Sequence, residues 1–378
     1  MKLFNCQQCG SLLYFENRTC EGCGTTLGYL PFEETLSALA VEDDAVTALG
    51  AADPARRRRL CVNAARDACN WLVDADGDET FCASCRHNHI IPELSDDRAL
   101  TLWRRLEVAK HRLFYSLIRL GIALPNRIDD PASGLAFDVL DPIPGQPKVL
   151  TGHRDGVITI NLDEADDAHR EEMRHRMHET YRTLLGHCRH EVGHWIWDRM
   201  VRDQGRLDAF RALFGDERAD YPQALERHYQ DGAAPDWQQR TISAYATSHP
   251  WEDFAETWAH YLHIMDTLET ANAFGLGVKP TIDNAEALQV DIAIDPYRTA
   301  HMDEILDQWM PLVYAMNSLN RSMGLSDLYP FIISEPVREK LGFIHAMLQD
   351  QPGADALPPP PALQSPPAPQ PPEAESAG

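Results

Sequence analysis

The stretch Arg189-His190-Glu191-Val192-Gly193-His194-Trp195 lies in the middle of the chain. Residues four positions apart share one face of an α-helix, so His190 and His194 would lie side by side and could bind one zinc ion. Glu191 points to the edge of that face, where it could act as general base on a metal-activated water. A chance match is the alternative, because the same region contains other histidines: His175, His178 and His187.

A catalytic zinc site needs a third protein ligand and an open position. The metzincin pattern requires glycine and histidine where this chain has Trp197 and Met200, so that class is excluded. Glu252 and Glu256 lie four apart on a helix expected to begin near Pro250. We expect one carboxylate to bind zinc and the other to hold a ligating imidazole by its second N–H. The alternative is a pair of surface carboxylates.

These motifs resemble those of gluzincin metallopeptidases. The spacing of Tyr245, Glu252 and Glu256 is similar to that in the catalytic region of anthrax-lethal-factor-like peptidases. The resemblance implies that Glu252 is the third zinc ligand, that Glu256 supports it without binding the zinc, and that Tyr245 donates to the oxyanion. The gap of 57 residues between His194 and Glu252 is longer than in thermolysin-like enzymes.

Eight of the nine cysteines precede residue 90. The first four form two Cys-x-x-Cys-Gly motifs, in which each glycine allows the tight turn that directs thiolates at a metal. With a short strand expected at residues 11–15, this pattern predicts a zinc ribbon. Disulfides and an iron site are the alternatives. The predicted zinc ligands are Cys6, Cys9, Cys20 and Cys23.

A second structural zinc is predicted for Cys61, Cys69, Cys82 and Cys85. Only the last two have the Cys-x-x-Cys spacing, so this ligand set is less firmly defined. His87 and His89 follow them, and either could replace one cysteine. Trp71 is expected to pack against the site.

The order of these motifs resembles the bacterial family of zinc-binding metallopeptidases with an N-terminal zinc ribbon. The resemblance covers nearly all of residues 1–349. It implies an α+β fold, in which N-terminal four-cysteine zinc ribbons precede a mostly helical, zincin-like metallopeptidase domain with a small β-sheet. From the three ligand sets we predict three zinc ions, one catalytic and two structural.

We expect four segments along the chain. They are a zinc ribbon (1–30), a second four-cysteine region (31–94), the zincin-like domain (95–349) and a tail (350–378). The tail contains no Lys or Arg, and ten of the 26 prolines fall in residues 351–378, which predicts disorder.

Periodicity predicts the elements around the motif. Apolar residues three and four apart indicate a helix that Ser95 can cap at its start and that Gly121 stops. Asp155-Gly156 predicts the turn of a β-hairpin, one strand of which could hold an extended peptide if it lies at a sheet edge. Residues 164–200 read as a helix, broken near Gly186.

The formal net charge of −24 over 378 residues argues against binding to nucleic acid or to an anionic membrane. The run Arg56–Arg59 does not reverse this, because residues 1–95 hold 8 Lys/Arg against 14 Asp/Glu. We therefore expect these arginines to be solvated or paired with acidic groups. The sequence contains no apolar run of membrane-spanning length, and its start lacks a signal-peptide pattern, so we expect a cytoplasmic protein.

Three functions fit these motifs. The first is a zinc metallopeptidase acting on a protein or peptide. The second is an amidase that cleaves side-chain amide or isopeptide bonds. The third is a binding module whose zinc ribbons recruit a protein partner and whose metal site is vestigial. Cys188, beside the motif, is expected to be a buried packing residue.

Overall fold

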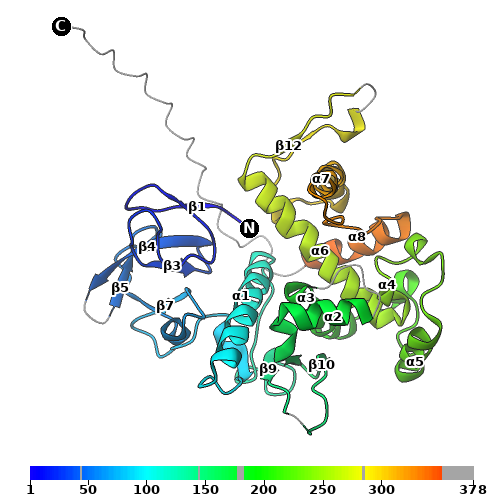
Figure 1. Cartoon of the computed structure of the whole chain (residues 1–378), viewed down its shortest axis with the longest axis horizontal. Helices are drawn as coiled ribbons and strands as arrows, with labels where there is room; N and C mark the ends of the chain where they lie inside the picture. Colours follow the sequence, from blue (N-terminus) through cyan, green and yellow to red (C-terminus); the bar gives the residue numbers. More distant parts are fainter. Residues whose placement is uncertain (43–44, 144, 177–182, 283–285, 351–378) are drawn as a thin grey trace.

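The computed structural model describes residues 1–42, 45–143, 145–176, 183–282 and 286–350. It combines helices with several small sheets, and α1 lies between the N-terminal strands and helices α3 and α6 (Figure 1). The predicted α+β architecture, with a four-cysteine region before a largely helical part, is therefore confirmed. The predicted disordered tail lies outside the described residues, apart from Asp350.

The N-terminal part is built from short antiparallel strands. β1 (Phe4–Asn5) and β2 (Leu12–Leu13) form a hairpin whose connection contains the first cysteine pair, Cys6 and Cys9. A five-stranded sheet follows in the order β3-β4-β5-β6-β7. Its strands are β3 (Leu27–Leu30), β4 (Thr35–Glu42), β5 (Ala45–Ala48), β6 (Arg58–Leu60) and β7 (Leu72–Asp74).

Strand pairing crosses the first predicted segment boundary, because β3 before residue 30 pairs with β4 after it. The arginine run lies at β6, and three of its members form ion pairs. Arg56 pairs with Asp74, Arg57 with Asp76 and Arg58 with Glu33. These arginines therefore neutralise acidic groups of the sheet and of its loops, as expected for a paired patch.

A mixed sheet joins the two parts of the chain, in the order β10-β11-β9-β8. β8 (Asn88–Ile90), which follows the last cysteine pair, runs parallel to β9 (Ala136–Leu140). β10 (Gly152–Arg154) and β11 (Val157–Asn161) form the predicted hairpin. Its turn contains Asp155 and Gly156, both with positive φ, which favours a short polar residue and glycine. β10 is an edge strand among the described residues.

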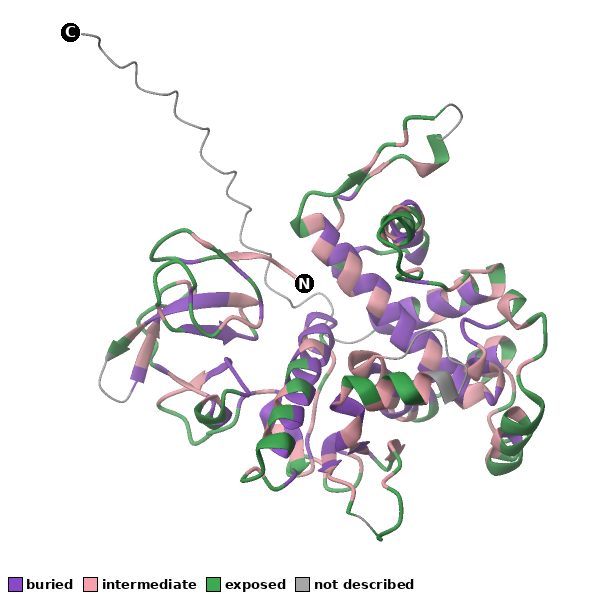
Figure 2. Ribbon diagram, in the orientation of Figure 1, coloured by how far each residue is buried: buried purple, intermediate pink, exposed green. Residues whose placement is uncertain are grey.

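Helix α1 (Asp97–Arg119) begins one residue later than the sequence suggests. Its N-cap is Asp96, whose side chain accepts a hydrogen bond from the Ala99 N–H at 2.7 Å. Gly121 follows the helix with φ +68°, a conformation that glycine adopts at little cost. No residue of α1 from Ala109 to Arg119 is exposed, so this half of the helix is covered by the neighbouring parts (Figure 2).

The predicted helix over 164–200 is two helices, and its break lies just before Gly186. α2 (Asp167–Arg176) ends before the undescribed residues 177–182, and α3 (Leu184–Ile196) begins after them. Thr183 caps α3 by accepting a hydrogen bond from the Gly186 N–H at 2.9 Å. Gly186 therefore belongs to the first turn of α3.

Helix α6 (Pro250–Ala273) begins at the predicted proline and packs along α3. A β-carbon at Gly193 would lie 3.0 Å from the Ala255 Cα and 3.0 Å from the Trp258 Cδ1. Glycine therefore lets the two helices approach closely. The helices are tied further along by an ion pair between Arg189 of α3 and Asp266 of α6.

The remaining elements surround this pair of helices. The helices are α4 (Leu207–Phe214), α5 (Tyr221–Asp231), α7 (Met302–Ser322) and α8 (Glu335–Gln349). A projecting hairpin is formed by β12 (Gly277–Val278) and β13 (Val290–Asp291) (Figure 1). Short helical turns are Val62–Arg66, Cys85–His87, Leu162–Ala165, Trp197–Arg202, Trp237–Gln239, Tyr245–Thr247, Glu286–Leu288 and Pro296–Arg298.

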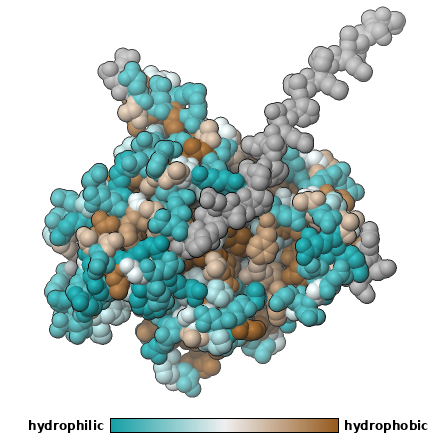
Figure 3. Space-filling view, turned by 180° about the vertical axis from the view of Figure 1, so that it is seen from behind, coloured by the Kyte–Doolittle hydropathy of each residue, from teal (hydrophilic) through white to brown (hydrophobic). Residues whose placement is uncertain are grey.

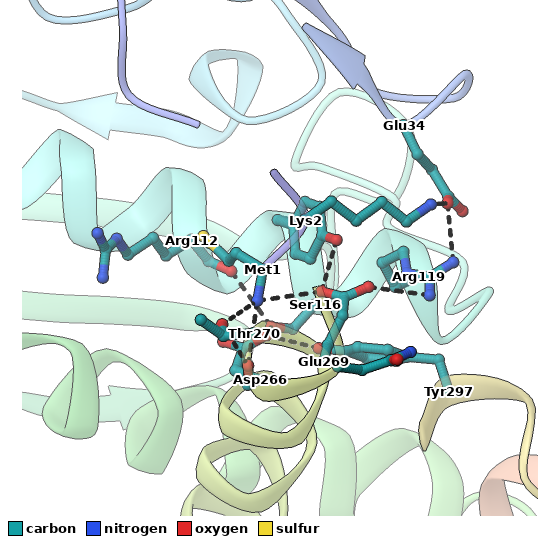
Figure 4. Close-up of polar contacts among 12 residues, drawn as sticks. Met1, Lys2, Glu34, Arg112, Ser116, Arg119, Asp266, Glu269, Thr270 and Tyr297 are labelled. Carbon is teal, nitrogen blue, oxygen red and sulfur yellow. Dashed lines mark hydrogen bonds and ion pairs between the residues drawn. The ribbon is translucent and has the colours of Figure 1, made fainter. Parts of the chain in front are cut away.

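A buried charged cluster joins the N-terminal strands to α1 and α6 (Figure 4). Arg119 of α1 is 1% exposed and forms ion pairs with Glu34 at 2.8 Å, Glu269 at 3.0 Å and Asp295 at 2.8 Å. The Met1 amino group lies 3.2 Å from Glu269. A buried guanidinium without such partners would be costly, so this cluster fixes the N-terminal strands against the helices.

A large hydrophobic core runs through both parts, from the ribbon through α1 to α3, α6 and α8. The face opposite to that of Figure 1 is largely hydrophilic, with hydrophobic residues gathered toward its centre (Figure 3). Among the described residues, no helix combines the length and apolar character needed to cross a membrane.

Candidate metal centre

Helices α3 and α6 bring His190, His194 and Glu252 together. One Glu252 oxygen, Oε2, lies 2.9 Å from the His190 Nε2 and 3.5 Å from the His194 Nε2. Nitrogen and oxygen ligands about 2.0–2.1 Å from a tetrahedral zinc ion lie about 3.3–3.4 Å apart, so the three atoms fit one ion. Glu252 is 1% exposed, and among the described residues its Oε2 has no polar neighbour besides the two imidazoles, so a cation held between these three groups would satisfy a buried oxygen.

Glu256 holds His190 from behind. The Glu256 Oε1 lies 2.7 Å from the His190 Nδ1, and the other oxygen accepts a hydrogen bond from the Ser243 hydroxyl at 2.6 Å. A carboxylate on the second ring nitrogen fixes the orientation of the imidazole and leaves its Nε2 free for a metal. Glu256 therefore lies where the sequence predicts a supporting residue.

Charge in this buried site is balanced between carboxylates and imidazoles. Burial alone would raise the pKa of Glu252, but His194 and His190 hold it well below its usual value. Burial would likewise raise the pKa of Glu256, which contact with His190 lowers to about 2. Burial would lower the pKa of His190, but the two carboxylates raise it well above its usual value. The site thus holds two anionic carboxylates. Glu252 faces the ring nitrogens of both histidines, and Glu256 contacts the far side of His190.

Glu191 and Tyr245 lie beside the three candidate ligands. Glu191 follows His190 on α3, is half-buried, and contributes to raising the pKa of Tyr245. The Tyr245 ring centroid lies 5.9 Å from that of His190. Burial is the main reason why the pKa of Tyr245 lies well above its usual value, so its hydroxyl stays protonated as a donor. Among the described residues, that hydroxyl has no hydrogen-bond partner.

Two aromatic residues at the site were missed by sequence reasoning. The Tyr221 hydroxyl donates to the Glu252 Oε1 at 2.6 Å, although 31 residues separate them. The Trp251 ring lies 3.8 Å from the His194 ring, centroid to centroid. Tyr221 had no recognisable signal, because its segment shows only scattered helical features. Trp251, which adjoins Glu252, could have been proposed from its position.

Neighbours of the motif behave as packing residues. Trp197 is 7% exposed and Met200 is 3% exposed, and both belong to the core rather than to the cluster of candidate ligands. Cys188 is fully buried, and burial raises its pKa to about 12, which keeps the thiol protonated. This agrees with the expectation that Cys188 has a packing role.

The first four cysteines converge on one point. Their Sγ atoms all lie within 4.8 Å of one another. The Cys6–Cys23 distance is 3.8 Å and the Cys9–Cys20 distance is 3.6 Å, close to the roughly 3.8 Å expected between thiolates 2.3 Å from a tetrahedral zinc ion. Cys6 and Cys20 are buried, whereas Cys9 and Cys23 are exposed.

The second four cysteines converge in the same way and are all buried. The Cys69 and Cys82 Sγ atoms lie 3.7 Å apart. The backbone N–H groups of Trp71 and Cys85 donate to cysteine sulfurs at 3.3 and 3.4 Å, which favours the thiolate form of a metal ligand. Trp71 is fully buried beside the cluster, as expected.

The histidine at this cluster is His111 of α1, not one of the two that the sequence suggests. The His111 Nε2 lies 3.2 Å from the Cys69 Sγ. His87 instead contacts the Leu135 carbonyl oxygen at 2.8 Å, and His89 pairs with Asp138. Neither His87 nor His89 therefore takes the place of a cysteine in the cluster. His111 connects the cluster to α1.

Comparison with known families agrees with these two kinds of site. Residues 99–347 match the family described as "Putative zinc-binding metallo-peptidase". The chain belongs to this family. The zinc-binding metallopeptidase family thus accounts for α1 through α8, and a family described as "zinc-ribbon domain" matches residues 3–96. Both descriptions support zinc binding and leave the number of ions open.

Close relatives of this metallopeptidase-family chain occur in mycobacteria. Two uncharacterized proteins of Mycobacterium tuberculosis and one of Mycobacterium bovis are each 42% identical to it over 352 residues. The matched region covers 93% of this chain and 96% of each relative. No solved structure matches the chain.

Proposed function

We propose that this protein is a zinc-dependent metallopeptidase that hydrolyses peptide bonds. In this proposal His190, His194 and Glu252 hold the catalytic zinc, and Glu256 supports His190. The observation that carries the proposal is the convergence of two imidazole nitrogens and one buried carboxylate oxygen from helices α3 and α6. Membership of a metallopeptidase family supports the same reaction class.

Two residues beside this centre have separate roles in the proposed reaction: Glu191 transfers protons and Tyr245 donates a hydrogen bond. Zinc in such a site supplies a Lewis acid that lowers the pKa of water and polarises a carbonyl group. Glu191 takes the proton from the attacking water and returns it to the leaving nitrogen. Tyr245, whose hydroxyl stays protonated, donates a hydrogen bond to the oxyanion that develops on the carbonyl oxygen.

The edge strand β10 favours an extended peptide as substrate. Its residue His153 lies beside the centre, with its ring centroid 6.2 Å from that of His194. A hollow in the surface of this hairpin is lined by residues 150–155, Val157 and Thr159, so His153 is the residue that the hollow shares with the surroundings of the centre. A peptide that adds to the free edge by main-chain hydrogen bonds would pass in front of His194.

Two further zinc ions have a structural role in this proposal. One is held by Cys6, Cys9, Cys20 and Cys23, and the other by Cys61, Cys69, Cys82 and Cys85. We propose that the first cluster also offers a protein partner a surface, because two of its four cysteines are exposed.

The test is the substitution Glu191→Gln. A glutamine keeps the shape of the side chain but cannot take a proton, so we expect the full zinc content and a loss of peptide hydrolysis of at least about 100-fold. The zinc content is measured by elemental mass spectrometry. Hydrolysis is measured by following cleavage of a library that contains both main-chain and isopeptide-linked peptides.

The matched control is Glu339→Gln, which removes an exposed carboxylate from α8 and should leave both measurements unchanged. Turnover by Glu191→Gln at the wild-type rate would contradict the assignment. If the protein cleaved only the isopeptide-linked members of the library, its substrate would be a side-chain amide bond and not a main-chain peptide bond.

A further inference from the structure

The two oxygens of Glu252 have different neighbours. Oε2 faces the ring nitrogens of His190 and His194, whereas Oε1 accepts a hydrogen bond from the Tyr221 hydroxyl at 2.6 Å. A carboxylate with two free oxygens can bind a metal through either one or through both. In this site only Oε2 is left for a metal.

The Tyr221 ring is held firmly against helix α6. Tyr221 is the first residue of α5, whose start is fixed by Asp220, because its side chain accepts a hydrogen bond from the Gln223 N–H at 3.0 Å. The ring lies edge-on to His249, with centroids 5.2 Å apart, and 5.8 Å from Trp251.

His249 links the two helix starts. Its Nδ1 accepts a hydrogen bond from the Trp251 N–H at 3.1 Å and so caps α6. Its Nε2 donates to the Ala219 carbonyl oxygen at 3.1 Å, two residues before Tyr221. The tyrosine hydroxyl and the carboxylate it contacts are thus fixed relative to one another before any metal binds, which is the condition for a preorganised ligand.

The role of Tyr221 differs from that proposed for Tyr245. The Tyr221 hydroxyl is committed to a carboxylate, whereas among the described residues the Tyr245 hydroxyl has no such partner. Glu252 is 1% exposed, so without Tyr221 its Oε1 would be buried without a donor or would turn toward the metal.

We propose that Tyr221 is a positioning residue that holds the Glu252 Oε1 and so makes Glu252 a ligand through one oxygen only. This inference rests on the proposed function, since it assumes that zinc binds at Glu252. Residues that orient metal ligands in this way typically contribute about 10–100-fold to metal affinity. Tyr221 acts through Glu252 and does not touch the substrate.

The experiment compares Tyr221→Phe with the matched control Tyr314→Phe, which removes an exposed hydroxyl from α7. Zinc affinity is measured by competition with a chelator, and His190→Ala identifies the zinc that belongs to this site. We expect Tyr221→Phe to weaken that zinc by about 10-fold or more, while Tyr314→Phe and the cysteine-bound zinc are unaffected. The KM for a peptide measured at saturating zinc should stay within about twofold, because the residue orients a metal ligand.

A double-mutant cycle separates orientation of Glu252 from a general effect on folding. In the Glu252→Ala background the tyrosine has no carboxylate to hold, so Tyr221→Phe should cause no further loss of zinc affinity. An equal loss in both backgrounds, or no loss in either, would overturn the inference. If wild-type protein and His190→Ala bound the same amount of zinc, the proposed function itself would fail, which is a different result.

Discussion

Single side chains around the candidate centre are fixed by partners on their far side. His190 is held by Glu256, Glu252 by Tyr221, and Glu256 in turn by Ser243. Each contact satisfies an atom that would otherwise be buried without a partner. The side chains of the candidate ligands are therefore restricted to few conformations, and little conformational entropy is lost when a metal binds.

His260, on the same helix as Glu252 and Glu256, leads to a prediction of how stability depends on pH. It is 4% exposed, and its Nδ1 lies 2.8 Å from the Tyr329 hydroxyl. Burial lowers its pKa to about 4, whereas an unfolded histidine has a pKa of about 6.5. Because the unfolded chain binds the proton more readily, the stability that His260 contributes is present above pH 6.5 and is lost as the pH falls toward 4.

The variant His260→Asn removes this titration and isolates its effect. Between pH 7.5 and pH 5, we expect the wild type to lose about 2 kcal/mol more unfolding free energy than the variant does. Urea unfolding at the two pH values measures both losses, and subtraction cancels the effect of acid on bound metal. Equal losses in the two proteins would show that His260 does not titrate in this way.

At the scale of elements, the centre depends on the close approach of α3 and α6. Gly193 allows this approach, since a β-carbon there would lie 3.0 Å from atoms of both Ala255 and Trp258. Glycine inside a helix is otherwise unfavourable by about 1 kcal/mol. The packing of the two helices therefore explains a residue that helix propensity alone would not favour.

We predict that Gly193→Ala forces the helices apart by a few tenths of an ångström. It should lower the free energy of unfolding by about 1–3 kcal/mol and reduce the zinc held at the centre. Denaturant unfolding and metal analysis measure the two effects. Gly342→Ala in α8, where a β-carbon meets nothing within 4 Å, is the control and should be neutral or slightly stabilising. Identical behaviour of the two variants would contradict the role given to Gly193.

Local signals predicted the elements that carry the motifs. Pro250 marked the start of α6, Asp155-Gly156 the turn between β10 and β11, and the pair Glu252 and Glu256 a helix with both carboxylates on one face. The break expected near Gly186 lies close to it, at Thr183, which caps α3 three residues earlier.

Contacts between distant parts of the sequence were not predictable. His111 meets Cys69 from 42 positions away, and Tyr221 meets Glu252 from 31. Residues so far apart in the sequence do not meet within one helix or one hairpin. The periodicity of the sequence therefore could not predict either contact. Motifs therefore identified the candidate ligands, whereas tertiary structure was needed to identify the residues that orient them.

In the whole molecule, the second cysteine cluster lies where the two parts of the chain meet. β8 follows that cluster and enters the sheet of β9, β10 and β11, while His111 of α1 contacts its sulfurs. α1 also packs against α3, which contains His190 and His194. A metal at the cysteine cluster would therefore stabilise the scaffold that positions the candidate catalytic centre.

The central claim is that zinc binds between α3 and α6 as well as in the two cysteine clusters. Anomalous X-ray diffraction on crystals of the purified protein, at energies on either side of the zinc absorption edge, tests it most directly. We predict three zinc peaks, one of them about 2.0–2.1 Å from the His190 Nε2, the His194 Nε2 and the Glu252 Oε2. Peaks at the cysteine clusters alone would contradict the account, because they would leave the protein without a catalytic metal.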